Sequence, residues 1–370
     1  MAKIVLLSPF FDPTLAFQEW VVAKCLVRMG HAVTVIFARH RAEMKHSTVS
    51  DEVKRRDILA HFPAITLHKV KSFGGWHTVF PLWGGTIRAL SEGHELAIVN
   101  APGNGFGYRA LRMLPRGMKA VVMFGDLLDN RKQMRPVIRR WKDRWYRWLF
   151  ERANRLTYNT AECLGILREA GLGKHEERIV LASLPYDEDF FHLSNASRAA
   201  GRLRTLTTIT RTLAHKPFDQ WLPPVFAFLR AHPSWRYVFA GIGTDSTAQR
   251  IRELVAASGL AERIELLGMQ DQAGMCRLFN EADLGLFPRA TIAIQQAQAT
   301  GLPVILPQRQ TVTHLVQAGH NGFYYDGLEK AAAMLEKAAA HAWPERRVLA
   351  EENRRWSGEG YTRLLIQGLV

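Results

Sequence analysis

The sequence predicts an α/β protein with two Rossmann-like domains, each a parallel sheet covered by helices, that face a central cleft. Short apolar runs rich in β-branched residues alternate with longer amphipathic stretches, which is the pattern of βαβ units. The chain has 370 residues, more than a usual single domain, and 47% of them are hydrophobic, which is enough for two cores. A polar, turn-rich stretch interrupts this rhythm once, near the middle.

The first domain is expected over residues 1–185. Its first elements are a buried strand at 3–7, a helix at 17–29 and, after a turn at Gly30, a second strand at 32–37. Further strands are predicted at 96–99, 120–124, 155–158 and 179–182. Because the strands are apolar throughout, we expect both faces of this sheet to be buried.

Residues 186–202 form the expected linker, and the second domain is expected over residues 203–344. Its predicted strands are 205–210, 237–240, 264–267, 284–287 and 304–306, and its predicted helices are 218–231, 247–258, 292–299 and 328–340. The last segment, 345–370, is predicted to form one or two helices that cross back to the first domain.

Several classes of protein are disfavoured. Three distant cysteines without C-x-x-C spacing argue against a disulfide framework or structural zinc and fit a reducing compartment. No stretch reaches the ~18 apolar residues that span a bilayer, and no cleavable signal is seen. We therefore expect a cytoplasmic protein whose membrane contact, if any, is peripheral.

Two short motifs resemble nucleotide or metal sites without completing them. Gly241-Ile242-Gly243 follows an apolar strand, but Ser246 stands where a dinucleotide loop needs a third glycine, so a tight turn is favoured. Asp187-Glu188-Asp189 has the spacing of a metal-binding D-x-D, but it lies in the linker, where solvated charges are expected. No P-loop occurs, and neither a cofactor nor an obligatory metal is expected.

The second domain carries a candidate anion site. Arg211 and Lys216 follow a predicted strand and suit the oxygens of a diphosphate, although a solvated loop is an equal alternative. The helix predicted from Ile292 would direct the N–H groups of Ile292 and Ala293 at an anion, with Thr291 as its cap.

These motifs, in this order, resemble the two-domain nucleotide-sugar glycosyltransferases of the B architecture, especially family four, over nearly the full length. Residues 29–35 resemble the family's "GHEVTV" segment, and Arg211 with Lys216 matches its "GRL…KG" pair, which binds the donor diphosphate. The "flG" element has its counterpart at Leu267-Gly268, which implies that Leu267 and Met269 flank the donor base. Residues 296–304 match "EAmAxGlPV", residues 316–322 "v.dg.nG", and residues 356–357 "fsW".

The resemblance has departures. The second of the family's paired glutamates aligns with Gln296, which can hydrogen-bond a ribose hydroxyl but carries no charge. The first glutamate has no clear counterpart, and the usual N-terminal glycine pair is absent. The resemblance therefore implies donor binding and leaves the retaining or inverting outcome open.

Candidate catalytic groups lie in the first domain. Asp126 follows a strand where the family often places "HG" or "HD" and could deprotonate an acceptor hydroxyl; helix capping or an ion pair is an equal alternative. Glu19, early in the first helix, is the second candidate. The loop of Asn100, Gly103 and Asn104 is expected to line the acceptor side, or to be a plain βα turn.

The net charge of +15 is concentrated in one segment around three tryptophans, Trp141, Trp145 and Trp148. Basic residues with interfacial aromatics predict docking on an anionic membrane surface, with Trp148 and Leu149 toward the core and the upstream arginines exposed. The alternative is that the tryptophans only pack on the sheet. Nucleic acid is not expected as a partner, because no nucleic-acid-binding motif accompanies the charge. The expected membrane patch consists of Arg135, Arg139, Arg140, Trp141, Lys142 and Arg144.

The sequence thus predicts a glycosyltransferase that moves a sugar from a nucleotide diphosphate donor to a hydroxyl acceptor. The expected acceptor is a lipid-linked saccharide or a cell-surface polysaccharide intermediate. The alternative is a non-catalytic sugar-nucleotide or glycan-binding protein on the same scaffold, which Gln296 and the missing glutamate motivate.

Overall fold

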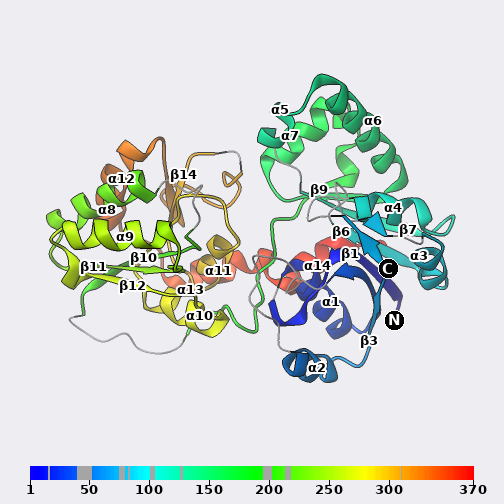
Figure 1. The fold of residues 1–370 in the computed structure, drawn as a ribbon, viewed down its shortest axis with the longest axis horizontal. Helices are drawn as coiled ribbons and strands as arrows, with labels where there is room; N and C mark the ends of the chain where they lie inside the picture. The colour runs from blue at the N-terminus through cyan, green and yellow to red at the C-terminus, as the bar shows by residue number, and fades with distance from the viewer. Residues whose placement is uncertain are drawn as a thin grey trace. The chain divides into compact units, whose positions relative to one another are not determined.

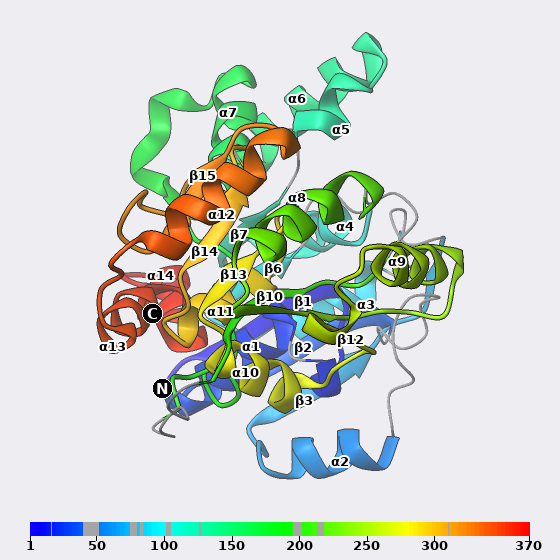
Figure 2. The ribbon, with the colours of Figure 1, turned by 90° about the vertical axis from the view of Figure 1, so that its left-hand side faces the viewer.

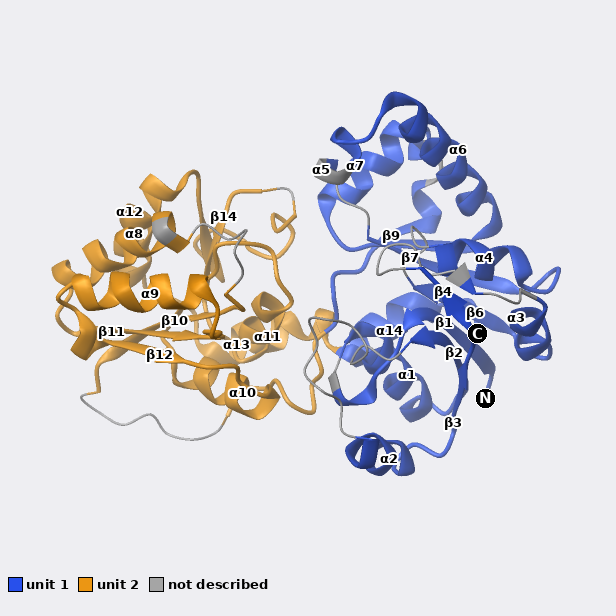
Figure 3. Cartoon of the chain, viewed as in Figure 1, with its two compact units in different colours: residues 1–185, 358–370 blue, residues 186–357 orange. Residues whose placement is uncertain are grey.

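The computed structural model describes residues 1–15, 17–39, 52–74, 80–81, 84–100, 105–125, 128–194, 202–212, 218–309 and 311–370. The chain divides into two compact units (Figure 3): unit 1 is Met1–Pro185 with Gly358–Val370, and unit 2 is Tyr186–Ser357. Among the described helices, none combines the length and the apolar character needed to cross a membrane.

Unit 1 contains a seven-stranded parallel sheet in the order β3-β2-β1-β6-β7-β8-β9. Figure 1 labels β1, β3, β6, β7 and β9 of this sheet. The strands are β1 (Lys3–Phe10), β2 (Ala32–Arg39), β3 (Ile65–Lys69), β6 (Leu96–Asn100), β7 (Lys119–Phe124), β8 (Arg155–Tyr158) and β9 (Ile179–Leu181). A separate antiparallel pair consists of β4 (Ser72–Phe73) and β5 (Phe80–Pro81).

Both faces of this sheet are covered, because alternate strand residues enter two different cores. The helices of unit 1 are α1 (Gln18–Arg28), α2 (Glu52–Ala60), α3 (Gly84–Ser91), α4 (Gly105–Met113), α5 (Leu128–Lys132), α6 (Pro136–Arg152), α7 (Ala161–Glu169) and α14 (Gly358–Ile366), with 3-10 turns η1 (Pro13–Leu15) and η3 (Gly173–Arg178). In β1, Val5 and Leu7 pack with α3, α4, α6 and α7, whereas Ile4 and Leu6 pack with α1, α2 and α14.

Unit 2 contains a six-stranded parallel sheet in the order β12-β11-β10-β13-β14-β15. The strands are β10 (Arg204–Ile209), β11 (Trp235–Ala240), β12 (Ile264–Leu267), β13 (Leu284–Leu286), β14 (Val304–Pro307) and β15 (Gly322–Tyr325). Helices α8 (Phe218–Ala231), α9 (Ser246–Ala257) and α12 (Ala331–Ala340) share one core on one face (Figure 2). The other helices are α10 (Gln272–Glu281), α11 (Ala293–Ala299) and α13 (Arg346–Glu352), with 3-10 turns η4 (Ala261–Arg263), η5 (Leu328–Lys330) and η6 (Asn353–Trp356).

The predicted fold class is confirmed: two parallel-sheet α/β units follow each other along the chain. In the last segment the chain returns to unit 1 only with α14, which packs against α1; α13 and η6 stay in unit 2. Strands β3, β4, β5 and β15 were not predicted. Strand β15 begins at Gly322, where a Cβ would lie 2.1 Å from the carbonyl oxygen of Val304, so this close strand pairing needs a glycine.

Candidate functional site

The topology of unit 2 points to a binding site at the carboxyl ends of β10 and β13. The chain leaves β10 toward β11 and β12 and then returns to β13 on the other side of β10. In open α/β sheets, ligands bind at such a switch point. Arg211 lies just after β10 and Arg289 just after β13, and both side chains are exposed. The structure thus brings two cations to the switch point.

The loop that carries Arg211 is fixed against the loop after β11. The N–H of Thr212 donates to the carbonyl oxygen of Gly241 at 3.1 Å, and the N–H of Gly243 donates to Thr212 Oγ1 at 2.9 Å. Gly241 has a φ of 101°, and a Cβ there would lie 2.4 Å from the carbonyl oxygen of Thr210. The tight turn predicted here is therefore confirmed, and its glycine is needed for the close approach of the two loops.

The end of β12 joins the same network. The N–H groups of Gly241 and Ile242 donate to the carbonyl oxygen of Leu267 at 3.1 and 3.0 Å. Two residues on, Met269 has 55% of its surface exposed. An exposed, flexible apolar side chain beside this edge of the sheet is suited to contact a planar base.

Helix α11 follows the β13 loop and begins one residue later than predicted. Ile292 is its N-cap and makes no side-chain capping bond, so the prediction that Thr291 caps the helix is wrong; the Thr291 carbonyl oxygen instead accepts from Ile294. Ala293 is buried, and Gln296 is only 8% exposed. No described residue donates a hydrogen bond to Gln296 Oε1, so this buried amide oxygen can accept one from a ligand.

A second switch point lies in unit 1, between β1 and β6. Asn100, the last residue of β6, is buried, and its Oδ1 accepts from Gln18 Nε2 at 2.8 Å. Its Nδ2 donates to Ser8 Oγ at 3.2 Å. Sequence reasoning identified Asn100 but missed Ser8 and Gln18; a polar residue within an otherwise apolar strand is the signal that could have found Ser8, whereas Gln18 is the first residue of α1 and carries no such signal.

Glu19, the second residue of α1, is 1% exposed and lies in the interior of unit 1. It faces Tyr361 of α14. Burial raises the pKa of the Tyr361 phenol, a hydrogen bond with Thr157 works against this, and the charge of Glu19 adds to the increase. The catalytic role of Glu19 stays a prediction.

Another buried carboxylate was not predicted. Asp12, after β1, is 1% exposed, and its Oδ1 accepts from the N–H of Thr14 at 3.1 Å and from Thr14 Oγ1 at 2.8 Å. Its Oδ2 lies 3.5 Å from an Arg55 nitrogen on α2. This ion pair ties the loop after β1 to α2.

Four predicted site residues lie outside the described residues: Asp126, Lys216, Gly103 and Asn104. Of the linker carboxylates, Asp187 was expected to be solvated, and this is wrong: it is 1% exposed and accepts the N–H of Asp189 at 3.1 Å. In the part of the chain that the structure describes, no cluster of three or more His, Cys, Asp or Glu side chains could hold a metal ion. All three cysteines are buried, and none of them forms a disulfide.

The predicted membrane patch lies on α6. Pro136 begins the helix after Arg135, and the side chains of Arg135, Arg139, Arg140, Trp141 and Arg144 are exposed, whereas Lys142 is partly buried with its Nζ 5.8 Å from the Tyr146 ring centre. Further along, Leu149 is fully buried and Trp148 packs partly on the core. The predicted division into a core-facing end and exposed upstream arginines is therefore confirmed.

Arg131 of α5 pairs with one carboxylate in the middle of α6 and with another at the end of α7. Arg131, which is buried, contacts Asp143 and lies 3.2 Å from Glu169. Burial works to lower the pKa of Arg131, but the hydrogen bond and charge of Asp143 and the charge of Glu169 outweigh it, so that the pKa is raised. The charge of Asp143 is thus neutralised by the buried Arg131 of α5 and not by the exposed arginines of α6.

The matches to known proteins agree with this architecture. A sequence model of the family described as glycosyl transferases group 1 matches residues 205–341, which lie in unit 2. No curated protein matches the chain in sequence. Among solved structures, a glycosyltransferase from Rickettsia africae is 14% identical, with a TM-score of 0.69 over 100% of this chain and 97% of that one.

Two further structures are similar over almost the full length. Sucrose-phosphate synthase from Thermosynechococcus elongatus is 15% identical, with a TM-score of 0.63 over 100% of this chain and 96% of the other. Anabaena HepE in complex with UDP-glucose is 13% identical, with a TM-score of 0.61 over 99% and 95%. At these identities the likeness shows the fold. Two parallel-sheet α/β units of this kind form the B architecture that nucleotide-sugar glycosyltransferases have. The chain has this fold, and residues 205–341 of unit 2 match the glycosyl transferases group 1 family.

Proposed function

We propose that the chain transfers a sugar from a nucleotide diphosphate donor to a hydroxyl acceptor. The observation that carries this proposal is the position of Arg211, exposed at the switch point of unit 2 on a loop fixed through Gly241, inside the segment that matches the family. Similar structures contain such a donor or its two parts: HepE was solved with UDP-glucose, and the pneumococcal O-GlcNAc transferase GtfA with UDP and GlcNAc.

In the proposed mechanism, charge stabilisation drives departure of the nucleotide. Arg211 and Lys216 neutralise the diphosphate leaving group, assisted by the N–H groups at Ile292 and Ala293, without an obligatory metal. Gln296 Oε1 accepts a hydrogen bond from a ribose hydroxyl of the donor. No described residue donates a hydrogen bond to this oxygen. Leu267 and Met269 flank the base.

The acceptor is proposed to bind unit 1. Asp126, or else Glu19, takes the proton of the attacking hydroxyl. The loop of Asn100, Gly103 and Asn104 lines the acceptor side, with Asn100 held by Gln18 at the switch point of unit 1.

The donor role of Arg211 is tested by thermal unfolding with a panel of nucleotides and nucleotide sugars, with and without magnesium. A ligand at ~100 times its dissociation constant adds ~2.7 kcal/mol of stability, and we expect one nucleotide class to do so without magnesium. Arg211→Ala should abolish this shift and lower transfer by about 100-fold or more, as expected for a lost charge-stabilising donor. Arg277→Ala, which removes an exposed cation from α10, should change neither. An unchanged shift in Arg211→Ala would contradict the proposal.

The second candidate is a binding protein without transfer, favoured by Gln296 in place of the family's glutamate. It predicts the same nucleotide-induced stabilisation but no sugar transfer to any acceptor and no consumption of the donor. Release of free nucleoside diphosphate that depends on an added acceptor decides between the two.

The acceptor is proposed to be a lipid-linked saccharide or a cell-surface polysaccharide intermediate, reached by peripheral docking at the cytoplasmic face of a membrane. The exposed basic face of α6 and Trp141, 62% exposed, support this. The protein should co-sediment with vesicles that contain phosphatidylglycerol and be released as salt screens the charges. Failure to bind at low salt would reject the docking and leave the donor chemistry untouched.

A further inference from the structure

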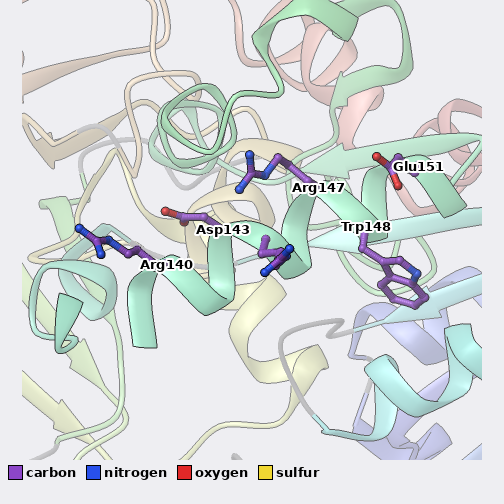
Figure 4. Close-up of a pocket in the computed structure, with 6 residues that line it drawn as sticks. Arg140, Asp143, Arg147, Trp148 and Glu151 are labelled. Atoms are coloured by element: carbon purple, nitrogen blue, oxygen red, sulfur yellow. The ribbon is translucent and has the colours of Figure 1, made fainter. Parts of the chain in front are cut away.

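Helix α6 borders a hollow of about 660 Å³ (Figure 4). Its described lining residues are Arg140, Asp143, Arg144, Arg147, Trp148 and Glu151. The three arginines follow each other at spacings of four and three residues, which puts them on one face of the helix. All three are exposed, and no described residue forms an ion pair or hydrogen bond with them.

The charge of this hollow favours an anion with several oxygens. Asp143 is already paired with Arg131, so Glu151 is the remaining acidic group among the described lining residues, against three arginines. A guanidinium binds two oxygens of a phosphate at once, and this geometry is the reason that arginine is used for phosphate recognition. A single phosphate diester offers only one negative charge, so three arginines match a group with two or more.

The wall of the hollow is held in place by aromatic packing. The ring of Trp148 meets that of Tyr108 edge to face, with centres 5.6 Å apart, and Tyr108 Oη accepts from Arg112 at 2.9 Å. Since Trp148 is anchored on α4 in this way, the hollow has one rigid apolar side and one cationic side.

Apolar side chains on the same helix indicate where the rest of the ligand lies. Val137, Ile138 and Trp141 are 77%, 50% and 62% exposed in the first turns of α6. Trp141 precedes Trp148 by seven residues and therefore lies on the same face. A molecule that satisfies both regions has a multiply charged head and an apolar body, which is the chemistry of a lipid and not of a free sugar phosphate.

We propose that the hollow on α6 is a lipid headgroup site that recognises a multiply charged phosphate group, while Val137, Ile138 and Trp141 enter the bilayer beside it. This proposal rests on the proposed membrane docking and adds that the protein selects among anionic lipids by their headgroup. A diffuse basic patch attracts all anionic lipids according to surface charge; a built hollow distinguishes them by headgroup.

The test compares two vesicles of equal surface charge, one with phosphatidic acid and one with phosphatidylglycerol in phosphatidylcholine. We expect the wild-type protein to bind the phosphatidic acid vesicles about tenfold more tightly, because the monoester can accept several guanidinium bonds. The variant Arg140→Gln/Arg144→Gln/Arg147→Gln should bind both vesicles equally.

A matched control removes three charges near the hollow but outside its lining: Lys132→Gln/Arg135→Gln/Arg139→Gln, all exposed positions. It should weaken binding to both vesicles by the same factor and keep the preference. Equal binding of the wild-type protein to both vesicles would overturn the proposal, and so would the same loss of preference in both triple variants.

Free inorganic diphosphate separates a lipid site from a site for a soluble phosphate. Trp141→Ser should lower vesicle binding at least about tenfold, since Trp141 is the largest of the three exposed apolar side chains and the one suited to the membrane interface. If diphosphate in solution binds as tightly as the vesicles do, and Trp141→Ser changes nothing, the ligand is not a lipid and the proposal fails. Thermal unfolding with nucleotides tests the donor site, whereas vesicle binding tests the headgroup site. Either result can fail while the other holds, so the two proposals are distinguished.

Discussion

At the scale of single residues, one arginine of unit 2 ties two helix ends together through five hydrogen bonds. The guanidinium of Arg346 donates to the carbonyl oxygens of Phe279, Asn280, Ala282 and Thr300 and to the Thr300 hydroxyl, at 2.9 to 3.1 Å. These acceptors lie at the carboxyl-terminal ends of α10 and α11, where helix carbonyls have no partner in their own helix. Arg346 thereby holds α11, which carries Gln296.

We predict that Arg346→Ala lowers the free energy of unfolding by about 3 kcal/mol or more, because several carbonyl groups lose a charged donor at once. Urea unfolding measures this. The neighbouring Arg347 is exposed, and Arg347→Ala should change stability by less than about 0.5 kcal/mol. Similar losses in both variants would show that charge, and not the hydrogen bonds to α10 and α11, is responsible.

A second residue-scale prediction concerns pH. Burial, with a smaller contribution from Arg355, lowers the pKa of His314 from 6.5 to about 4. Between pH 6.5 and 4 the unfolded chain therefore takes up a proton that the folded chain does not. The free energy of unfolding should therefore decrease as the pH is lowered from 6.5 to 4, by up to about 3 kcal/mol. In His314→Asn this part of the loss should disappear when urea unfolding is compared at pH 7 and pH 4.5.

The sequence predicted the site residues that stand in local motifs, but not those that depend on partners far away in the chain. Arg211 and Gln296 stand in local motifs whose spacing can be read along the chain. Gln18 and Asn100 are 82 residues apart, and Arg346 and Thr300 are 46 apart. A single sequence shows that such residues are polar but not which of them meet, because their partners are set by the strand order.

At the scale of elements, the predicted strands and helices agree best where apolar residues dominate. Helix α8 was predicted at the observed bounds although Pro223 and Pro224 lie inside it, since its apolar residues bind it to the sheet. The edge strand β3 was missed because its side chains are only partly buried, so that its sequence lacks the continuous apolar pattern. Partial burial accounts for the missed β3 but not for β15, which was missed although three of its four residues are buried.

Helix α14 provides the prediction at this scale. It is the segment of unit 1 that comes from the far end of the chain, and its Leu365 is fully buried in the core shared with α1. We expect Leu365→Ala to lower the free energy of unfolding by about 2 to 5 kcal/mol, as for other buried leucines. Leu364, the preceding residue, is only partly buried. Leu364→Ala should cost clearly less in the same urea experiment, and a reversed order would contradict the assignment of the core face.

At the scale of the whole molecule, the chain crosses between the units twice, and the two crossings lie side by side. It leaves unit 1 after Pro185 and returns at Gly358. Immediately inside unit 2, Tyr186 pairs with Ser357, and its N–H donates to the carbonyl oxygen of Trp356 at 3.1 Å. Each unit also has cores of its own. Both ends of unit 2 are therefore held together without the rest of the chain.

This arrangement predicts that the two units fold separately. Residues 186–357 alone should unfold cooperatively and be stabilised by the same nucleotides as the full chain, because Arg211, Gly241 and Gln296 all lie within them. Unit 1 should fold when residue 185 is joined to residue 358 by about six glycine and serine residues, which easily span the short distance between the paired ends. Residues 1–185 without α14 are the control, and they should be much less stable, because Trp20 and Leu26 of α1 then lose Tyr361 and Leu365 from their core. If residues 186–357 fold but bind no nucleotide that the full chain binds, unit 2 is not sufficient for the donor site, and groups of unit 1 must complete it.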